Sequence, residues 1–433
     1  MLSWLIAKGG HDSWINPAKS LVSCMFFVLT SGSNMRERTL ELMKKYPLID
    51  GHNDLALQLR ILHNNKLSQI DLHNVSNVAT DINRLKTGHV GAQVFAAYVM
   101  CTAQEKDAVR LTLEQIDVIR RMCSEYQELE LVTSAEALNS SKKIACLISI
   151  EGGHSIDSSL AALRMFYQLG VRSMALTHTC NTPWAESSSK LYSFYPRSNN
   201  SLTKFGKAVV AEMNRLGMII DLSHSSWDTA QAVIQISRAP VTFSHSSAFA
   251  VCKHDRNIPD WLLHMLKENK GLVMVNMHSR FVACSDSGNI SNAADHFDHI
   301  KKVIGAEWIG IGGDYDGASR FPHGLEDVSK YPALIQELLL RGWSEEELSG
   351  VLRDNFLRVF GEVERVRDEL KGTIPAEEQI PFSEAANPCR LVLRPPKPVT
   401  LSTRNAPSHA QSGHAAVFAM VFAMLMIHFN PLL

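Results

Sequence analysis

The side chains best suited to chemistry in this sequence are histidines and carboxylates that stand at the ends of short apolar runs. They are His52, Asp54, Glu151, His178, His224, His245 and Asp314. A single histidine after an apolar run is more often a structural residue than a ligand. Placement of such groups at the ends of six separate runs is hard to attribute to chance, so we interpret the set as one site.

The make-up of this set favours a metal centre. His52 and Asp54 are two residues apart, so on an extended segment both side chains point to the same side and can bind one ion together. With Glu151, His224 and His245 they supply three imidazoles and two carboxylates, a mixture suited to zinc. Since one catalytic zinc usually takes three protein ligands, this set predicts two zinc ions per chain, with Glu151 bridging them.

Two neighbouring ions indicate hydrolysis, because they can hold a water between them as hydroxide and polarise a carbonyl. Asp314, in a glycine-rich turn, is then placed to handle protons, and His178 to donate a hydrogen bond to the oxyanion. A helix N-cap for Asp314 and a core position for His178 are the structural alternatives. The sequence has no G-x-S-x-G, H-E-x-x-H or Walker A motif, so serine-hydrolase, zincin and P-loop chemistry have no support.

The apolar runs alternate with segments of helical period. Eight runs of strand type occupy 48–50, 93–99, 144–150, 173–177, 218–222, 241–243, 272–276 and 308–311. Helices are expected over 106–126, 158–168, 204–216 and 225–237, and an amphipathic helix over 33–46 precedes the first strand. Eight strand-helix units predict an α/β fold, a (β/α)8 TIM-like barrel of the metal-dependent hydrolase type, with its active site at the C-terminal ends of the strands. A doubly wound open sheet is the alternative.

The two ends of the chain predict a secreted, lipid-anchored protein. The leader has an apolar run at 21–30 typical of a signal peptide, and a buried segment of the mature protein is the alternative. The C-terminal tail at 415–427 is apolar and follows a small, polar stretch, which is typical of a glycosylphosphatidylinositol signal. The lipid is expected to attach somewhere from Ser402 to Ser412. The expected segments are a leader at 1–33, a catalytic domain at 34–370, a Pro-rich stalk at 371–412 and the attachment signal at 413–433.

Charge and the remaining motifs agree with a position on the outer leaflet of the plasma membrane. The formal net charge of -1 provides no field that would attract nucleic acid, so no nucleic-acid partner is expected. Four Asn-x-Ser sequons, at Asn74, Asn139, Asn199 and Asn289, are candidate glycosylation sites. The chain has eight cysteines and no C-x-x-C pair, so disulfides are expected in an oxidising compartment, although the spacing does not say which cysteines pair.

Six longer strings resemble the membrane dipeptidases, also called renal dipeptidases, of peptidase family M19. They are DGHNDL at 50–55, EGGHS at 151–155, THTCNTPW at 177–184, SHSS at 244–247, GGDYDG at 312–317 and GLEDV at 324–328. The resemblance extends over residues 46–370 and is strongest to the membrane-bound dipeptidase 2 branch. Members of that branch cleave cystinyl-bis-glycine and convert leukotriene D4 to leukotriene E4.

The family resemblance implies a barrel with two zinc ions on the five ligands named above. It implies that His178 and Arg256 contact the substrate, with Arg256 on the C-terminal carboxylate of the dipeptide, and that Asp314 handles protons. It also implies disulfides between Cys101 and Cys180 and between Cys252 and Cys284. A homodimer linked through Cys389 in the stalk follows from the same resemblance.

The family resemblance leaves substrate preference open, because three stretches depart from the usual pattern. Val94-Phe95-Ala96 stands where Phe-Trp-Ser is usual, Ala56 where proline is common, and Phe281 where the renal member has tyrosine. Two other functions remain possible for the same constellation. One is a binuclear-metal amidohydrolase that acts on lactams or other amides, and the other is a surface protein that has kept the fold and lost turnover.

Overall fold

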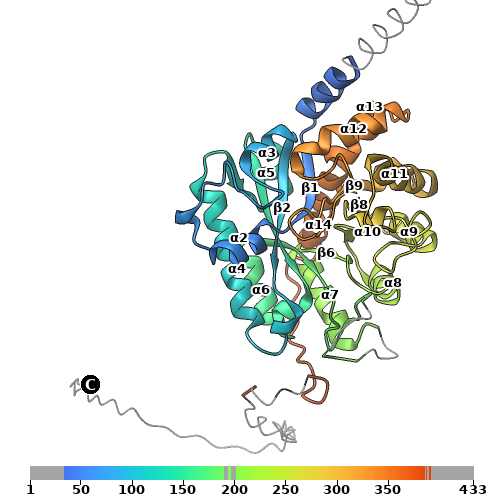
Figure 1. Cartoon of the computed structure of the whole chain (residues 1–433). Coiled ribbons are helices and arrows are strands. Elements are labelled where there is room, and N and C mark those ends of the chain that lie inside the picture. Colours follow the sequence, from blue (N-terminus) through green and yellow to red (C-terminus); the bar gives the residue numbers. More distant parts are fainter. Residues whose placement is uncertain (1–33, 190–193, 197–200, 386, 388–389, 392–433) are drawn as a thin grey trace, which may run out of the picture. The chain divides into compact units, whose positions relative to one another are not determined.

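A closed barrel of eight parallel strands organises the part of the chain that the structure describes (Figure 1). This computed structural model describes residues 34–189, 194–196, 201–385, 387 and 390–391. The eight strands are β1 Leu48–Asn53, β2 Val90–Tyr98, β4 Ile144–Glu151, β5 Val171–Ala175, β6 Ile219–Asp221, β7 Thr242–Phe243, β8 Leu272–Val275 and β9 Ile309–Ile311. Each corresponds to one of the eight apolar runs of the sequence, so the predicted barrel is confirmed and the open sheet is excluded.

The order of strand pairing closes the sheet into a barrel. β1 pairs with β2 on one side and, through Asp50 and Ile311, with β9 on the other. β2 pairs in turn with β4 from Ala92–Ala145 to Tyr98–Glu151, all in parallel. A short additional strand, β3 Leu129–Leu131, pairs with the start of β4 and was not predicted from the sequence. Because every barrel strand runs in the same direction, the residues at the carboxyl ends meet on one face.

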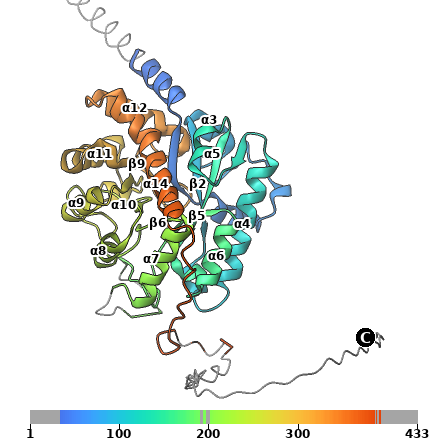
Figure 2. The same cartoon turned by 180° about the vertical axis from the view of Figure 1, so that it is seen from behind.

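Helices cover the outside of the barrel (Figures 1 and 2). The longer ones are α2 Leu55–His63, α4 Ala108–Glu125, α6 Leu160–Gln168, α7 Lys204–Leu216, α8 Trp227–Ile236, α9 Asp260–Glu268, α11 Ile290–Ile304, α12 Tyr331–Leu340 and α14 Asn355–Glu369. The short ones are α3 Ile82–Thr87, α5 Ala135–Ser140, α10 Ser279–Val282 and α13 Glu345–Ser349. The four connecting helices expected from the sequence correspond to α4, α6, α7 and α8, each within two residues of its expected ends.

The core has an outer and an inner part. A large apolar cluster fills the space between the strands and the surrounding helices. A smaller cluster joins inward-facing strand residues such as Ile49 and Leu147 to Phe356 and Phe360 of α14. Burial on both faces explains why the strands read as nearly continuous apolar runs instead of alternating ones.

Two segments flank the barrel. Residues 34–45 form the expected amphipathic helix, and Leu42 and Met43 are buried against the core. The described residues up to Asn387 belong to one compact unit with the barrel. Ala376 accepts a hydrogen bond from Arg164 and donates one to Glu212, which ties this segment to α6 and α7.

Several predictions concern residues outside the described part of the chain. These are the leader at 1–33, the sequon at Asn199, Cys389, the stalk from residue 392 on with the attachment site from Ser402 to Ser412, and the attachment signal at 413–433. Among the described residues, no helix is both long and apolar enough to cross a bilayer. The sequon residues Asn74, Asn139 and Asn289 are all exposed, as a glycan would require.

Three disulfides tie the described loops and elements together. Cys101–Cys180 and Cys252–Cys284 are the two pairs that the family resemblance implies, with Cα–Cα distances of 5.9 and 5.5 Å. Cys123 of α4 and Cys146 of β4 form a third pair, which was not predicted. The Cys123 and Cys146 side chains lie within the large apolar cluster, so this bond joins a helix to the barrel wall.

Candidate metal centre at the carboxyl ends of the strands

The seven residues singled out from the sequence all lie at one end of the barrel. His52 is near the end of β1, Asp54 follows it, and Glu151 is the last residue of β4. His178, His224, His245 and Asp314 follow β5, β6, β7 and β9 within two or three residues. The parallel direction of the strands therefore brings together groups that are up to 262 residues apart in the sequence.

Tight backbone turns hold two of these groups over the barrel mouth. His224 and Asp314 have φ angles of 68° and 59°, in the left-handed region that costs free energy for residues other than glycine. Gly312, just before Asp314, passes so close to the backbone that an added Cβ would lie 1.7 Å from the carbonyl oxygen of Ser244. Only glycine fits there, which explains the glycine-rich sequence around Asp314.

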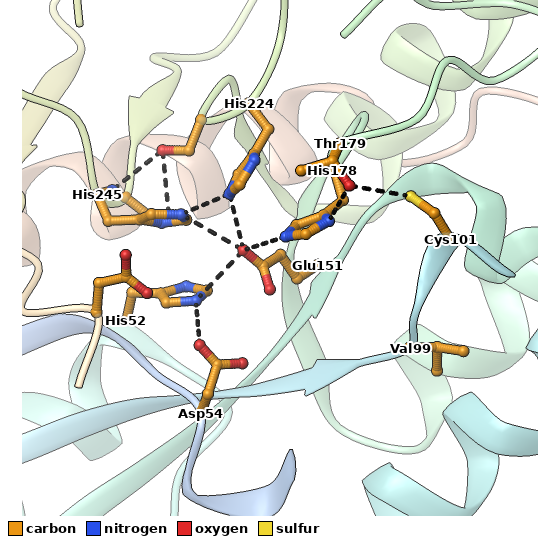
Figure 3. Close-up of polar contacts among 12 residues, drawn as sticks. His52, Asp54, Val99, Cys101, Glu151, His178, Thr179, His224 and His245 are labelled. Atoms are coloured by element: carbon orange, nitrogen blue, oxygen red, sulfur yellow. Dashed lines mark hydrogen bonds and ion pairs between the residues drawn. The ribbon is translucent and has the colours of Figure 1, made fainter. Parts of the chain in front are cut away.

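The carboxylate of Glu151 is the centre of the site (Figure 3). Its Oε1 atom lies 3.1 Å from Nε2 of His224, 3.4 Å from Nε2 of His245 and 3.5 Å from Nε2 of His52. Nε2 of His178 is slightly farther, at 3.8 Å. His52 also contacts Asp54, with 3.1 Å between Nε2 and Oδ2. Four imidazoles from four different strand ends thus point one nitrogen each at a single carboxylate oxygen.

The donor set fits divalent cations. His52, Asp54 and Glu151 form one group whose ligand atoms lie within 4.8 Å of one another, and Glu151, His178 and His224 form another. Nε2 of His224 and Nε2 of His245 are only 2.9 Å apart. Oδ1 of Asp54 is buried and has no hydrogen-bond partner among the described residues. A bound cation would accept the lone pairs of these buried, converging nitrogen and oxygen atoms, including Oδ1 of Asp54.

Burial perturbs the pKa values of the site. It raises the pKa of Glu151 well above its usual value, and the nearby carboxylate of Asp54 adds to the rise. Burial by itself would lower the pKa of His52, but Glu151 and Asp54 outweigh it and raise that pKa to about 10. Burial lowers the pKa values of His224 and His245, and the positive charge of Arg256 lowers them further. His224 and His245 are therefore neutral near pH 7, and the neutral imidazole is the form that binds metal.

Asp314 is held beside the cluster without being one of the five expected ligands. Its Oδ2 accepts a hydrogen bond of 2.9 Å from Nδ2 of Asn276, the residue that follows β8. Burial raises the pKa of Asp314 to about 6, against the lowering effect of His52. Asp314 caps none of the described helices, so its N-cap alternative is excluded. A carboxyl group with such a pKa can both accept and donate a proton near neutral pH.

Arg256 and His178 flank the cluster. Arg256 is 9% exposed, and its guanidinium donates to the Ser246 hydroxyl at 3.2 Å and to the carbonyl of His245 at 3.1 Å. Its Nε is buried without a hydrogen-bond partner in the described part of the chain, and the group lies 5.4 Å from the ring centre of Phe281. A buried cation with a donor to spare is suited to a substrate carboxylate. The ring of His178 lies 4.2 Å from that of His224, so it faces the site instead of the core.

The structure also shows polar residues at the site that were not singled out from the sequence. Asn276 holds Asp314, and Asp221 and Ser244 form a hydrogen-bonded chain to His245. Asn276, Asp221 and Ser244 stand at strand ends, and this position could have identified them from the sequence. Their residue types, however, are common in turns and do not by themselves indicate a site. No sequence signal identified the Cys123–Cys146 pair.

Comparisons with known proteins give a consistent result. A sequence profile of the membrane dipeptidases, peptidase family M19, matches residues 36–373. Dipeptidase 3 of Mus musculus is 55% identical over 365 residues, which cover 84% of this chain and 74% of the mouse protein. Dipeptidase aclJ of Aspergillus oryzae is 42% identical over 361 residues, covering 79% of this chain and 85% of the fungal protein.

A solved structure agrees with the fold. A metallopeptidase from Rhodobacter sphaeroides, crystallised with a phosphinate mimic of the dipeptide L-Ala-D-Ala, superposes with a TM-score of 0.66 at 26% identity. The match covers 73% of this chain and 99% of the bacterial one. Since relatives named Dipeptidase 3 are 55% identical to this chain, its placement in the dipeptidase 2 branch stays a prediction.

Proposed function

Because the chain belongs to the membrane dipeptidase family, peptidase family M19, and is a metal-dependent dipeptidase, we propose that it works with two zinc ions bridged by Glu151. One ion is held by His52 and Asp54, and the other by His224 and His245. The observation that carries this proposal is the convergence of imidazole nitrogens on Oε1 of Glu151 at 3.1 to 3.8 Å. Five ligands of mixed type exceed what one zinc with an open position takes.

The protein side chains have separate tasks in the proposed reaction. A pair of divalent cations at such a site activates the attacking water and polarises the carbonyl of the scissile bond. Asp314, held beside the cluster by Asn276, takes the proton of the water and passes it to the leaving amine. His178, at the rim of the cluster, donates a hydrogen bond to the developing oxyanion.

Arg256 sets the requirement for a free C-terminal carboxylate in this proposal. Its guanidinium is fixed by Ser246 and the His245 carbonyl and faces the metal ligands, so a substrate carboxylate paired with it ends close to the reacting bond. A carboxylate one residue beyond the scissile bond marks cleavage at the C-terminal residue, and the limit to two residues rests on the dipeptidase family. The bacterial relative that binds a phosphinate dipeptide mimic supports this substrate class, because a phosphinate resembles the tetrahedral intermediate of peptide hydrolysis.

The finer features of the predicted biology remain part of the proposal. We expect cystinyl-bis-glycine and leukotriene D4 among the substrates, since both present a dipeptide unit with C-terminal glycine. Attachment to the outer cell surface by a glycosylphosphatidylinositol lipid rests on the apolar C-terminal tail. A disulfide-linked homodimer rests on Cys389 and on the family resemblance.

The experiment that tests the function joins metal content to turnover. Purified protein is analysed for zinc by mass spectrometry and assayed on dipeptides, N-acyl amino acids and lactams before and after treatment with a chelator. Two equivalents of zinc that leave with the chelator, together with hydrolysis of dipeptides, support the proposal. Faster turnover of lactams than of dipeptides would contradict the proposal and indicate an amidohydrolase. Absence of turnover in the zinc-loaded protein would indicate a non-catalytic surface protein.

A further inference from the structure

A buried hydrogen-bonded chain leads from Asp221, the last residue of β6, to the imidazole of His245. The Ser244 hydroxyl donates to Oδ2 of Asp221 at 2.5 Å, and Nδ1 of His245 lies 2.7 Å from the same hydroxyl oxygen. Asp221 is 3% exposed and His245 is 1% exposed, so bulk water does not compete for these groups. The mechanism above uses neither Asp221 nor Ser244.

The orientation of Asp221 is determined by the backbone. Its Oδ1 accepts two N–H groups, from Ser223 and from Ser244, each at 2.9 Å. Oδ2 is thereby directed at the Ser244 hydroxyl. A carboxylate offers only acceptors, so the single proton of the Ser244 hydroxyl is committed to Asp221. The Ser244 oxygen can then only accept from Nδ1 of His245, which must carry a proton.

We infer that Asp221, acting through Ser244, is a positioning residue that keeps the proton of His245 on Nδ1 and leaves the Nε2 lone pair free for a metal ion. A neutral imidazole has one N–H, so protonation at Nδ1 makes Nε2 an acceptor. Nε2 is the atom of His245 that faces Glu151 and His224. Second partners of this kind commonly orient metal-binding histidines and raise their basicity.

The two imidazoles of the proposed second ion differ in this respect. Nδ1 of His224 is buried and has no hydrogen-bond partner in the described chain, whereas Nδ1 of His245 is held. The Asp221 chain does not reach His52 or Asp54 through any hydrogen bond between the described residues. Loss of Asp221 should therefore weaken the ion on His224 and His245 more than the ion on His52 and Asp54. This consequence rests on the proposed two-ion function.

Asp221→Asn is the most informative change because it keeps the shape of the side chain and reverses one hydrogen bond. The two backbone N–H groups hold the amide oxygen in the place of Oδ1, so the amide nitrogen faces Ser244. The Ser244 oxygen must then accept from the amide, and its own proton is donated to Nδ1 of His245. That arrangement moves the histidine proton to Nε2 and blocks the metal-binding lone pair.

The test measures the tautomer and the metal separately. Metal-free protein labelled with ¹⁵N-histidine is compared by long-range ¹H–¹⁵N correlation, with a His245→Ala spectrum to assign the signal. We expect the Nδ1–H form in the native sequence and the Nε2–H form in Asp221→Asn. In zinc titrations, the affinity of one of the two zinc equivalents should fall by about 10- to 100-fold, with the other less affected.

Two further variants keep the inference falsifiable if Asp221→Asn does not fold. Ser244→Ala should weaken the binding of the same zinc equivalent as Asp221→Asn, and Ser244→Thr, which retains the hydroxyl, should restore it. Ser247→Ala is the matched control, because the Ser247 hydroxyl is also buried after the same strand and has no hydrogen-bond partner among the described residues. It should leave the tautomer and both zinc affinities unchanged.

Outcomes for this inference and for the proposed function are distinct. An Asp221→Asn protein with the Nδ1–H tautomer and native affinity for both ions would overturn the inference, as would equal zinc affinity in Ser244→Ala and Ser244→Thr. A native protein that binds fewer than two zinc ions would overturn the two-ion proposal. The tautomer comparison on metal-free protein would still decide the role of Asp221.

Discussion

Replacing Glu151 with glutamine removes the charge at the centre of the site and keeps the shape of the side chain. Oε1 of Glu151 lies within 3.5 Å of imidazole nitrogens from three expected ligands, so both proposed ions depend on this carboxylate. An amide supplies a weaker, uncharged oxygen on one side and an N–H donor on the other. We therefore expect Glu151→Gln to lose both ions and all measurable dipeptide hydrolysis.

The size of the effect on stability follows from linkage. An ion that binds only the folded protein stabilises it by about 2.7 kcal/mol at a concentration 100 times its Kd, so two ions contribute about 5 kcal/mol. The unfolding entropy is roughly 2.1 cal/mol/K per residue. For a domain of about 340 residues, the free energy of unfolding therefore falls by roughly 0.7 kcal/mol per degree near the Tm. Saturating zinc should therefore raise the Tm of the native protein by about 7 °C and leave that of Glu151→Gln unchanged.

Differential scanning calorimetry of metal-free and zinc-loaded samples measures this difference. Glu212→Gln is the matched control, because Glu212 is also a buried carboxylate but pairs with Arg215 and Arg164 on the outer helices, away from the site. This control should lose about 2 kcal/mol of stability with or without metal and keep the full rise in Tm. A Glu151→Gln protein that still gains about 7 °C with two equivalents of zinc would refute the bridging role.

Three further changes address the other groups of the site and its surroundings. Asp314→Asn should lower kcat by about 10²- to 10⁴-fold in steady-state assays while zinc analysis still finds both ions, and loss of either ion would instead make Asp314 a ligand. Arg256→Lys should raise KM for dipeptides by about 10-fold or more, with little change for C-terminally amidated dipeptides, because a lysine cannot form the bidentate pair; equal effects on both substrates would contradict a role in carboxylate binding. His154 donates to the Val99 carbonyl, and burial lowers its pKa to about 4, so only the unfolded chain takes up its proton as the pH falls below 6.5. We measure the free energy of unfolding of metal-free protein in urea. Between pH 6.5 and pH 4 it should fall by about 3 kcal/mol more for the native sequence than for His154→Gln. Parallel pH profiles would show that His154 is protonated in the folded state.

The sequence by itself determined the fold class and the composition of the site. Eight apolar runs separated by helical segments indicate parallel strands, and parallel strands present their carboxyl ends on one face. Because His52, Glu151, His224 and His245 each end or follow such a run, their convergence could be inferred without coordinates. The residue types, imidazole and carboxylate, then indicated the metal chemistry.

Only the tertiary structure decided how these groups meet and what holds them. The 2.9 Å approach of His224 to His245 and the central place of Glu151 depend on barrel closure and on turns with positive φ, which residue spacing does not encode. The chain from Asp221 to His245 joins the ends of two neighbouring strands, and its members are residue types that turns use everywhere. Contacts of this kind arise from register between strands, a property of the closed sheet and not of any local segment.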